Sequence, residues 1–184
     1  VTVMETGEPR STSARISGKG PELSVDIIRD APGWDALVED AALMAAARAA
    51  CDAAAPAERQ CSVALLLTGD TELRRLNGAW RGKDEPTNVL SFPNEASPVD
   101  GDIRHLGDIA LALETVTREA ADRRIPPRQH AAHLVVHGML HLFGYDHGQD
   151  AEAERMETLE TEILRGLGLP DPYADEMIPA GEAR

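Results

Sequence analysis

Aromatic residues and cysteines are scarce in this sequence, and each shortage excludes a class of protein. Aromatics make up 3% of the 184 residues, so leucine, valine, isoleucine and alanine must fill the core. The two cysteines, Cys51 and Cys61, form no Cys-x-x-Cys motif and are too few for a disulfide framework, which indicates reduced thiols in a cytoplasmic protein. No apolar run is long enough for a transmembrane helix, and residues 1–20 lack the apolar stretch of a signal peptide.

Basic residues are also in short supply. The chain has 18 lysines and arginines against 32 aspartates and glutamates, a formal net charge of −14. This charge favours solubility and argues against a broad nucleic-acid-binding surface, although it does not exclude a local basic patch. Hydrophobic residues, at 42%, suffice for a globular core, and the length suits one domain.

The spacing of apolar residues predicts a single α/β (α+β) domain over residues 21–169, with helices on one or both faces of a sheet. Strands are predicted at 23–30, 61–68, 88–92 and 106–114, and helices at 35–50, 71–80, 115–124, 126–143 and 151–168. The apolar run 61–68 is typical of a central strand buried on both faces, and Asp70 is expected to cap the helix that follows it. Residues 1–20 are predicted to be a disordered leader and residues 170–184 a flexible tail.

Three histidines stand in the stretch HGMLHLFGYDH, residues 137–147, with the spacing His-x3-His-x5-His. His137 and His141 are four residues apart on a helix, so their side chains share one face. Gly144 allows a positive φ, and the resulting turn can bring His147 to the same ion. Three imidazoles with an open fourth position describe a catalytic zinc, so these three histidines are the predicted metal ligands. Imidazole also accepts nickel, copper or iron.

The other histidines have weaker claims as ligands. His133 lies one turn before His137 on the same helix face and could extend the ligand set, but a packing or hydrogen-bonding role behind the ligands is the favoured interpretation. His130 and His105 have weaker claims still, and His105 is expected in a solvated loop.

Position 138 separates this motif from the metzincin proteases, whose pattern is His-Glu-x-x-His-x-x-Gly-x-x-His. The second residue here is Gly138. Because the glutamate at that place is the general base of those enzymes, peptide hydrolysis by their usual route is disfavoured.

The stretch HGMLHLFGYDH resembles the signature of the YbeY family, the bacterial metal-dependent endoribonucleases of rRNA maturation. LNGAWRGKDEPTNVLSFP (76–93) and HLGDIALALE (105–114) resemble the family in the same order, so the resemblance covers about residues 62 to 148. It implies a mixed sheet of about four strands with surrounding helices. It implies one zinc per chain on His137, His141 and His147, and action on single-stranded RNA in 16S rRNA 3′-end maturation and ribosome quality control. It also implies catalytic roles for Arg81 and His137.

The chemistry of Arg81 agrees with the role that the resemblance implies. A guanidinium can grip a phosphate through paired hydrogen bonds and stabilise charge that develops on it. Lys83 adds charge to the same loop and is the second predicted substrate-binding residue, while Arg74 and Arg75 precede them on the helix. The four would form a local basic cluster in an acidic protein. The alternative is an ordinary solvated turn.

Four further polar residues near these motifs can each be interpreted in two ways. Asn88 and Ser91 could hydrogen-bond substrate or cap the loop and strand. Asp108 could orient a histidine or cap a turn. Asp146 could fix the turn before the last histidine, the favoured interpretation, or accept a proton.

Three hypotheses for function follow from these patterns. The first is a zinc-dependent endoribonuclease, with the general base open between a metal hydroxide, Asp146 and the 2′-hydroxyl of the RNA. The second is a metal hydrolase of the metzincin type that acts on a peptide or another small ester. The third is a non-catalytic, zinc-stabilised assembly factor that binds RNA or the proteins of the small ribosomal subunit, whose basic surfaces would suit the acidic chain.

Overall fold

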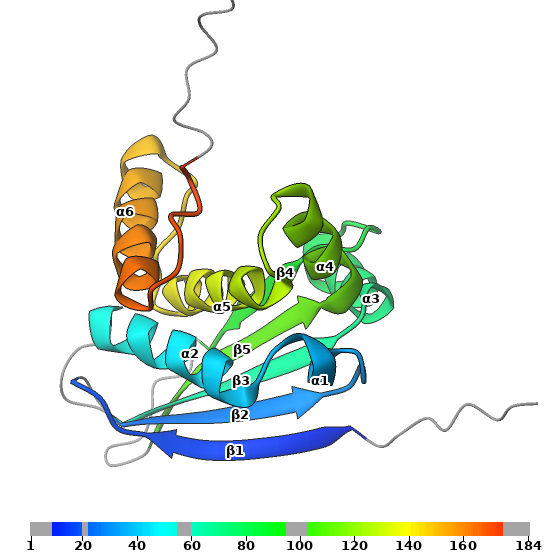
Figure 1. Ribbon diagram of the computed structural model, residues 1–184, viewed down its shortest axis with the longest axis horizontal. Helices are drawn as coiled ribbons and strands as arrows, with labels where there is room; N and C mark the ends of the chain where they lie inside the picture. The colour runs from blue at the N-terminus through cyan, green and yellow to red at the C-terminus, as the bar shows by residue number, and fades with distance from the viewer. Residues whose placement is uncertain (1–8, 20–21, 55–59, 95–102, 175–184) are drawn as a thin grey trace, which may run out of the picture.

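The computed structural model describes residues 9–19, 22–54, 60–94 and 103–174, which form one mixed five-stranded sheet and six helices (Figure 1). The strands are β1 (Arg10–Ile16), β2 (Leu23–Arg29), β3 (Cys61–Thr68), β4 (Val89–Pro93) and β5 (Arg104–Ala112). The helices are α1 (Trp34–Leu37), α2 (Asp40–Ala54), α3 (Asp70–Arg81), α4 (Leu113–Asp122), α5 (Pro127–Leu142) and α6 (Asp150–Gly166). The α/β class with a mixed sheet is confirmed, with one strand more than expected. None of the described helices combines the length and apolar composition that a membrane span requires.

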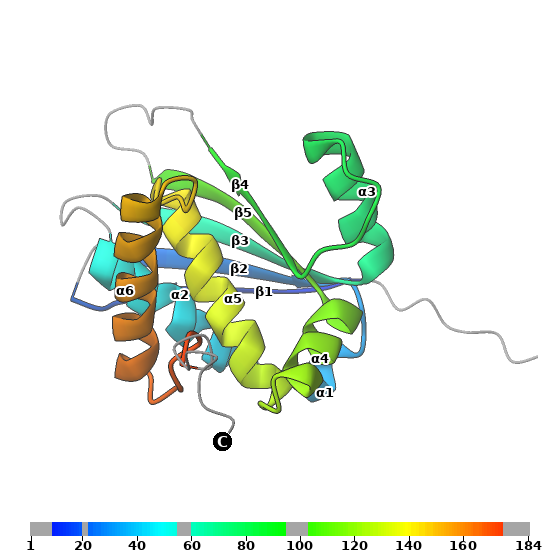
Figure 2. The same ribbon diagram turned by 90° about the horizontal axis from the view of Figure 1, so that it is seen from above.

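The sheet has the order β1-β2-β3-β5-β4. β2, β3 and β5 run parallel, while the two edge strands β1 and β4 pair antiparallel with their neighbours. Figures 1 and 2 show α2, α5 and α6 on one side of this sheet. We call that side the helix face and the opposite side the open face.

The extra strand β1 corrects the prediction of a disordered leader over residues 1–20. Residues 10–16 pair along their whole length with β2, and Arg10 forms an ion pair with Asp35. Most β1 side chains are exposed, and Ile16 is its one apolar residue packed against the core. A strand held mainly by backbone hydrogen bonds has little hydrophobic pattern to reveal it. Residues 1–8 and 20 of the predicted leader and residues 175–184 of the predicted tail lie outside the described residues.

The helix predicted at 35–50 is two helices, α1 and α2. Val38 between them is extended, with φ −149° and ψ 139°. The Arg29 guanidinium fixes this break, because it donates to the Val38 carbonyl at 2.9 Å and to the Asp40 carboxylate at 2.6 Å. A long-range contact of this kind has no local sequence signal.

Strand β3 is central, as predicted, but it is not buried on both faces along its length. Val63 and Leu65 are fully buried under the helices, whereas Ala64 and Leu66 on the open face are partly exposed. Among the described helices, only α3 reaches over one end of the open face, where its Leu73 packs in a small cluster with strands β4 and β5. No other described element covers the rest of the open face.

Helices α3 and α4 cap each other at their N-termini. The Asp70 carboxylate accepts hydrogen bonds from the Thr115 backbone N–H at 3.1 Å and hydroxyl at 2.7 Å, and the Glu114 carboxylate accepts one from the Asp70 N–H at 2.8 Å. Asp70 is thus a cap, but of the neighbouring helix rather than its own. This exchange fixes α3, whose far end carries Arg81.

Candidate metal centre

The turn after α5 places the third histidine of the motif. Gly144 has φ +87°, and the N–H groups of Gly144 and Tyr145 bond back to the carbonyls of His141 (2.9 Å) and Leu140 (3.0 Å). This pattern is a Schellman motif, which requires a residue that tolerates positive φ. The glycine turn predicted from the sequence is therefore present, and it returns the chain towards the helix face that carries the first two histidines.

His137, His141 and His147 come together at this turn. One ligand atom from each lies within 4.8 Å of the others, and the Nε2 atoms of His137 and His141 are 3.1 Å apart. Two nitrogens bound to one zinc at 2.0–2.1 Å with tetrahedral geometry would be about 3.3 Å apart. The donor set and its spacing thus fit a single metal ion.

The hydrogen bonds behind these rings fix which nitrogen faces the centre. His141 Nδ1 lies 2.9 Å from the Tyr145 carbonyl, and His137 Nδ1 lies 3.4 Å from the carboxylate of Glu160. Both partners only accept, so each Nδ1 carries its proton and each Nε2 presents a lone pair. Two lone pairs that face each other at 3.1 Å repel, and a metal ion bound to both nitrogens would remove this repulsion.

Burial favours the uncharged form of the central histidine. Burial and the neighbouring His137 and His147 lower the pKa of His141, although the hydrogen bond to the Tyr145 carbonyl acts in the opposite direction. A neutral imidazole is the form that binds a metal ion.

Glu160 on α6 organises the back of the site. It is fully buried, and its carboxylate lies 2.7 Å from His133 Nε2 and accepts a hydrogen bond from the Tyr173 hydroxyl at 2.6 Å. Burial alone would raise the pKa of Glu160, but the hydrogen bonds with His133 and His137 outweigh it and lower the pKa to about 2. A carboxylate behind a metal-facing histidine fixes its tautomer and ring orientation. His133, His137 and Glu160 also form a second group with ligand atoms within 4.8 Å.

Glu160 is not among the residues predicted above, although the sequence contains a signal for it. Met156, Ile163 and Leu164 form the buried stripe of α6, and Glu160 stands in the middle of that stripe at helical spacing. A charge on the buried face of a helix needs a partner. Two of its partners, His133 and His137, lie on α5.

Gly138 has a packing role that explains the missing glutamate. A Cβ atom at this position would lie 3.0 Å from Ile109 side-chain atoms and 3.0 Å from the Ser91 hydroxyl. Helix α5 therefore lies close to β4 and β5 here, position 138 faces the sheet, and a side chain at this position would require Ile109 and Ser91 to shift. Ser91 lies against this contact.

The remaining polar residues have structural partners. His105 lies in β5 rather than in the expected loop, and it bridges Ser62 (3.1 Å) and Asp108 (3.2 Å). A register shift in β5 opposite Ser62 and Val63 puts His105 and Asp108 on the same face, although they are three residues apart in a strand. Asp108 thus orients a histidine, but not one of the three in the motif.

Two more residues stabilise local structure. Asn88 donates to Glu119 at 2.8 Å and accepts from the Val89 N–H at 2.7 Å, and the same glutamate lies 2.7 Å from the buried His130. Asp146 accepts a hydrogen bond from the N–H of the residue after it at 2.8 Å, which supports its predicted role in the turn.

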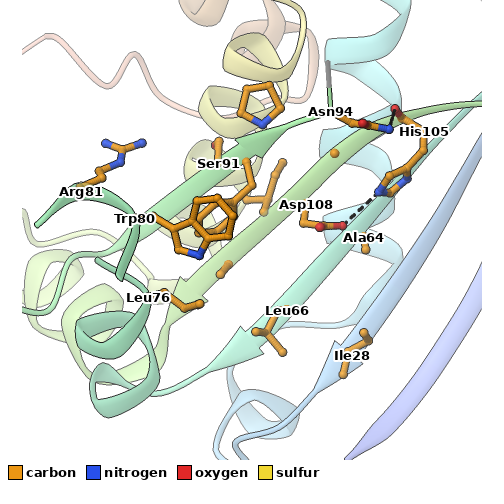
Figure 3. A pocket seen from close by; sticks show the side chains of 15 residues that line it. Ile28, Ala64, Leu66, Leu76, Trp80, Arg81, Ser91, Asn94, His105 and Asp108 are labelled. Carbon is orange, nitrogen blue, oxygen red and sulfur yellow. Dashed lines mark hydrogen bonds and ion pairs between the residues drawn. The ribbon is translucent and has the colours of Figure 1, made fainter. Parts of the chain in front are cut away.

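The predicted basic cluster is smaller than the sequence suggested. Arg74 is paired through two hydrogen bonds with Asp84, and Arg75 likewise with Glu72. Arg81 and Lys83 are exposed, and neither forms an ion pair with any residue that the structure describes. The structure shows no direct contact between Arg81 and the three histidines within its described part. Arg81 instead lies at the rim of a pocket (Figure 3).

That pocket occupies the open face and has a volume of about 890 Å³. We call it the open-face pocket. It is lined mainly by Ile28, Ala64, Leu66, Leu76, Trp80 and Phe92. Figure 3 shows Trp80 and Arg81 near one end and the hydrogen-bonded pair His105 and Asp108 at the other.

A model of one protein family, endoribonuclease YbeY, matches residues 33–168. The chain is 48% identical over 157 residues to the endoribonuclease YbeY of Bradyrhizobium sp., covering 83% of this chain and 90% of that protein. It is 47% identical over 167 residues to the endoribonuclease YbeY of Allorhizobium ampelinum, covering 85% and 98%. The chain belongs to the YbeY family.

A solved structure supports the fold of this family member. The solution structure of TM1509 from Thermotoga maritima superposes with a TM-score of 0.50, covering 86% of this chain and 99% of that one. Sequence identity is 22%, so this likeness concerns the fold alone.

Proposed function

We propose that this chain is a metal-dependent endoribonuclease that hydrolyses phosphodiester bonds in RNA, with one zinc ion per chain held by His137, His141 and His147. The observation that carries the proposal is the pair of facing Nε2 atoms, 3.1 Å apart, whose opposite ring nitrogens are both engaged. The name endoribonuclease that the relatives carry supports the reaction class.

The chain's own residues supply positioning and charge. Glu160 and the Tyr145 carbonyl hold the first two imidazole rings with Nε2 towards the centre, and this is the catalytic role we give His137. An ion bound there supplies Lewis acidity towards a phosphoryl oxygen or a water molecule. Arg81 and Lys83 would bind the phosphate of the substrate and stabilise charge that develops on it.

We further propose single-stranded RNA as the substrate, in 16S rRNA 3′-end maturation and ribosome quality control in the cytoplasm. Exposed cations confined to a short loop suit a single strand better than the broad surface of a duplex. The net charge of −14 suits contacts with basic proteins of the small ribosomal subunit. Two buried cysteine thiols fit a reducing compartment.

The metzincin alternative is not favoured. Its general base would stand at position 138, which faces Ile109 and Ser91 of the sheet at 3.0 Å. The relatives named above are endoribonucleases rather than proteases. The non-catalytic assembly factor remains the second candidate, since the acidic surface alone would support it.

The test is RNA cleavage in defined metal. The purified protein is incubated with a single-stranded rRNA fragment and with the same fragment in a duplex, beside the His141→Ala and Arg81→Ala variants. We expect cleavage of the single strand that requires metal and is lost in both variants. Tight RNA binding without cleavage at any metal concentration would favour the assembly factor, and cleavage unchanged in Arg81→Ala would remove this arginine from the mechanism.

A further inference from the structure

Trp80 is an unusual residue for the surface of this protein. Its side chain is 72% exposed, while the other tryptophan, Trp34, is fully buried and donates its indole N–H to the Thr68 carbonyl. Trp80 and Ile103 are the large apolar residues exposed among those that the structure describes. An exposed aromatic ring that borders a pocket is a typical binding element.

Neighbouring structure supports the Trp80 side chain. The ring packs edge-on against Phe92 of β4, with 5.7 Å between the ring centroids. It stands on the last turn of α3, whose N-terminus is fixed by the exchanged caps with α4. One side of the ring is thus supported, and the rest is open to solvent beside the open-face pocket (Figure 3).

The charges beside Trp80 select an anionic ligand. Arg81 follows it directly and Lys83 lies two residues further, and neither is neutralised by an acidic partner in the described part of the chain. Their neighbours Arg74 and Arg75 are neutralised. An aromatic ring next to unpaired cations matches a nucleobase joined to its phosphate, since bases stack on aromatic rings while cations bind the backbone.

We propose that the open-face pocket binds an unpaired nucleobase of single-stranded RNA, which stacks on Trp80 while Arg81 and Lys83 bind the adjoining phosphates. This inference rests on the proposed function, because it names a second subsite for the same substrate. At the far end of the pocket, His105 and Asp108 offer polar atoms to a neighbouring base edge. An unpaired base is required, because the bases of a duplex are stacked on each other.

Strand β4 connects this pocket to the histidines. Phe92 contributes to the pocket wall, while the adjacent Ser91 also touches the position of Gly138 on the histidine-bearing helix. β4 is an edge strand, so nothing pairs with its outer side within the described sheet. RNA that crosses this edge would have a base on the open face and a phosphate towards the helix face.

Tryptophan fluorescence tests the proposal, because Trp34 is buried and only Trp80 can stack with a ligand. The full-length protein is titrated with a short oligoadenylate that carries 2′-O-methyl sugars, checked by electrophoresis to remain intact. We expect the RNA to quench the fluorescence of the unaltered protein but not that of Trp80→Phe, in which Trp34 is the remaining tryptophan. We expect Trp80→Ala to bind the RNA about 5- to 100-fold more weakly. Two phosphate contacts predict a salt dependence with a log–log slope of about −1.4, reduced by about 0.7 in Arg81→Ala.

Ile103→Ala is the matched control, because it removes the other exposed apolar side chain and should leave binding unchanged. Binding by Trp80→Ala equal to that of the unaltered protein would overturn the proposal. Equal quenching by the same strand in a duplex would also overturn it. A dimer of the unaltered protein that Trp80→Ala disrupts would overturn it too, because the face would then serve self-association.

The proposed function can fail separately from this subsite. If quenching depends on Trp80 but no RNA is cut, the base site stands and the nuclease proposal fails. If RNA is cut with the same apparent KM by Trp80→Ala, while His141→Ala is inactive, the nuclease proposal stands and the base site fails.

Discussion

The two faces of the sheet differ in how their polar residues are held. On the helix face, the histidines of α5 are backed by a fully buried glutamate and a backbone carbonyl. On the open face, Trp80, Arg81 and Lys83 stand exposed at the end of α3. The metal-facing groups are held by buried partners, whereas the groups proposed for RNA are exposed, and Arg81 and Lys83 have no ion-pair partner among the described residues. Changes on the helix face should therefore alter metal affinity or stability, and changes on the open face should alter RNA binding and cleavage without changing the metal content.

The largest effect should come from His141→Ala, which removes the histidine at the centre of the cluster. Two remaining imidazoles cannot hold the ion as three do, so metal affinity should fall by more than the about 10- to 100-fold typical of supporting residues. Elemental analysis of the purified protein should find about one zinc per chain before the change and almost none after it. If the His141→Ala protein still contains about one zinc per chain, the assignment of the three histidines as metal ligands is wrong.

Glu160→Gln should have the next largest effect. It keeps the shape of the side chain but removes the charge that orients His137 and His133. Zinc affinity, measured by competition with a chelator, should fall about 10- to 100-fold. Tyr173→Phe is the milder control, since it removes one hydrogen bond to the same carboxylate. Equal affinity in Glu160→Gln would show that the buried carboxylate has no part in positioning.

Arg81→Ala tests the open face. Loss of a charge-assisted contact to phosphate should weaken RNA binding by about 10- to 100-fold. The thermal midpoint should stay the same, because the side chain is exposed and has no ion-pair partner among the described residues. Arg74→Ala is the matched control, because this arginine is already paired with Asp84. If both variants bind RNA equally poorly, general charge rather than the position of Arg81 decides binding.

Gly138→Glu should have a smaller effect, on stability. The new side chain would press on Ile109 and Ser91, and overpacking of this kind costs about 1–3 kcal/mol of the free energy of unfolding. Gly166→Ala on α6 is the control, because its Cβ meets nothing within 4 Å and should stabilise the helix slightly. Denaturant unfolding measures both. A Gly138→Glu protein of unchanged stability would contradict the close packing of α5 on the sheet.

The sequence predicted the histidine site better than its surroundings. Helical spacing and the glycine turn depend on neighbouring residues, so His137, His141, His147 and Gly144 could be placed from local pattern alone. Glu160 reaches the site from a helix that begins after the motif, and this long-range contact was missed. Its charge within an apolar stripe was the available signal.

Several features of the open face and the sheet edge also depend on long-range contacts that the sequence pattern does not predict. The ion pair between Arg74 and Asp84 and the exposure of Trp80 depend on where α3 ends against the sheet, which spacing does not fix. The pair between Arg75 and Glu72 lies within α3 at i,i+3 spacing, so the sequence did contain a signal for it. Strand β1 was missed because its side chains are mostly exposed and its pairing with β2 is a backbone interaction. The position of His105 in β5, at a register shift between β3 and β5, also had no signal in the sequence.

The most direct measurement is a zinc titration of the metal-depleted protein, followed by the cleavage of single-stranded RNA at each point. Three histidines around one ion predict that activity rises in proportion to added zinc and levels off at about one equivalent per chain. Under the same conditions His141→Ala should stay inactive. Cleavage by the metal-depleted protein at the full rate, or a His141→Ala protein that responds to zinc as the unaltered one does, would contradict the proposed metal centre.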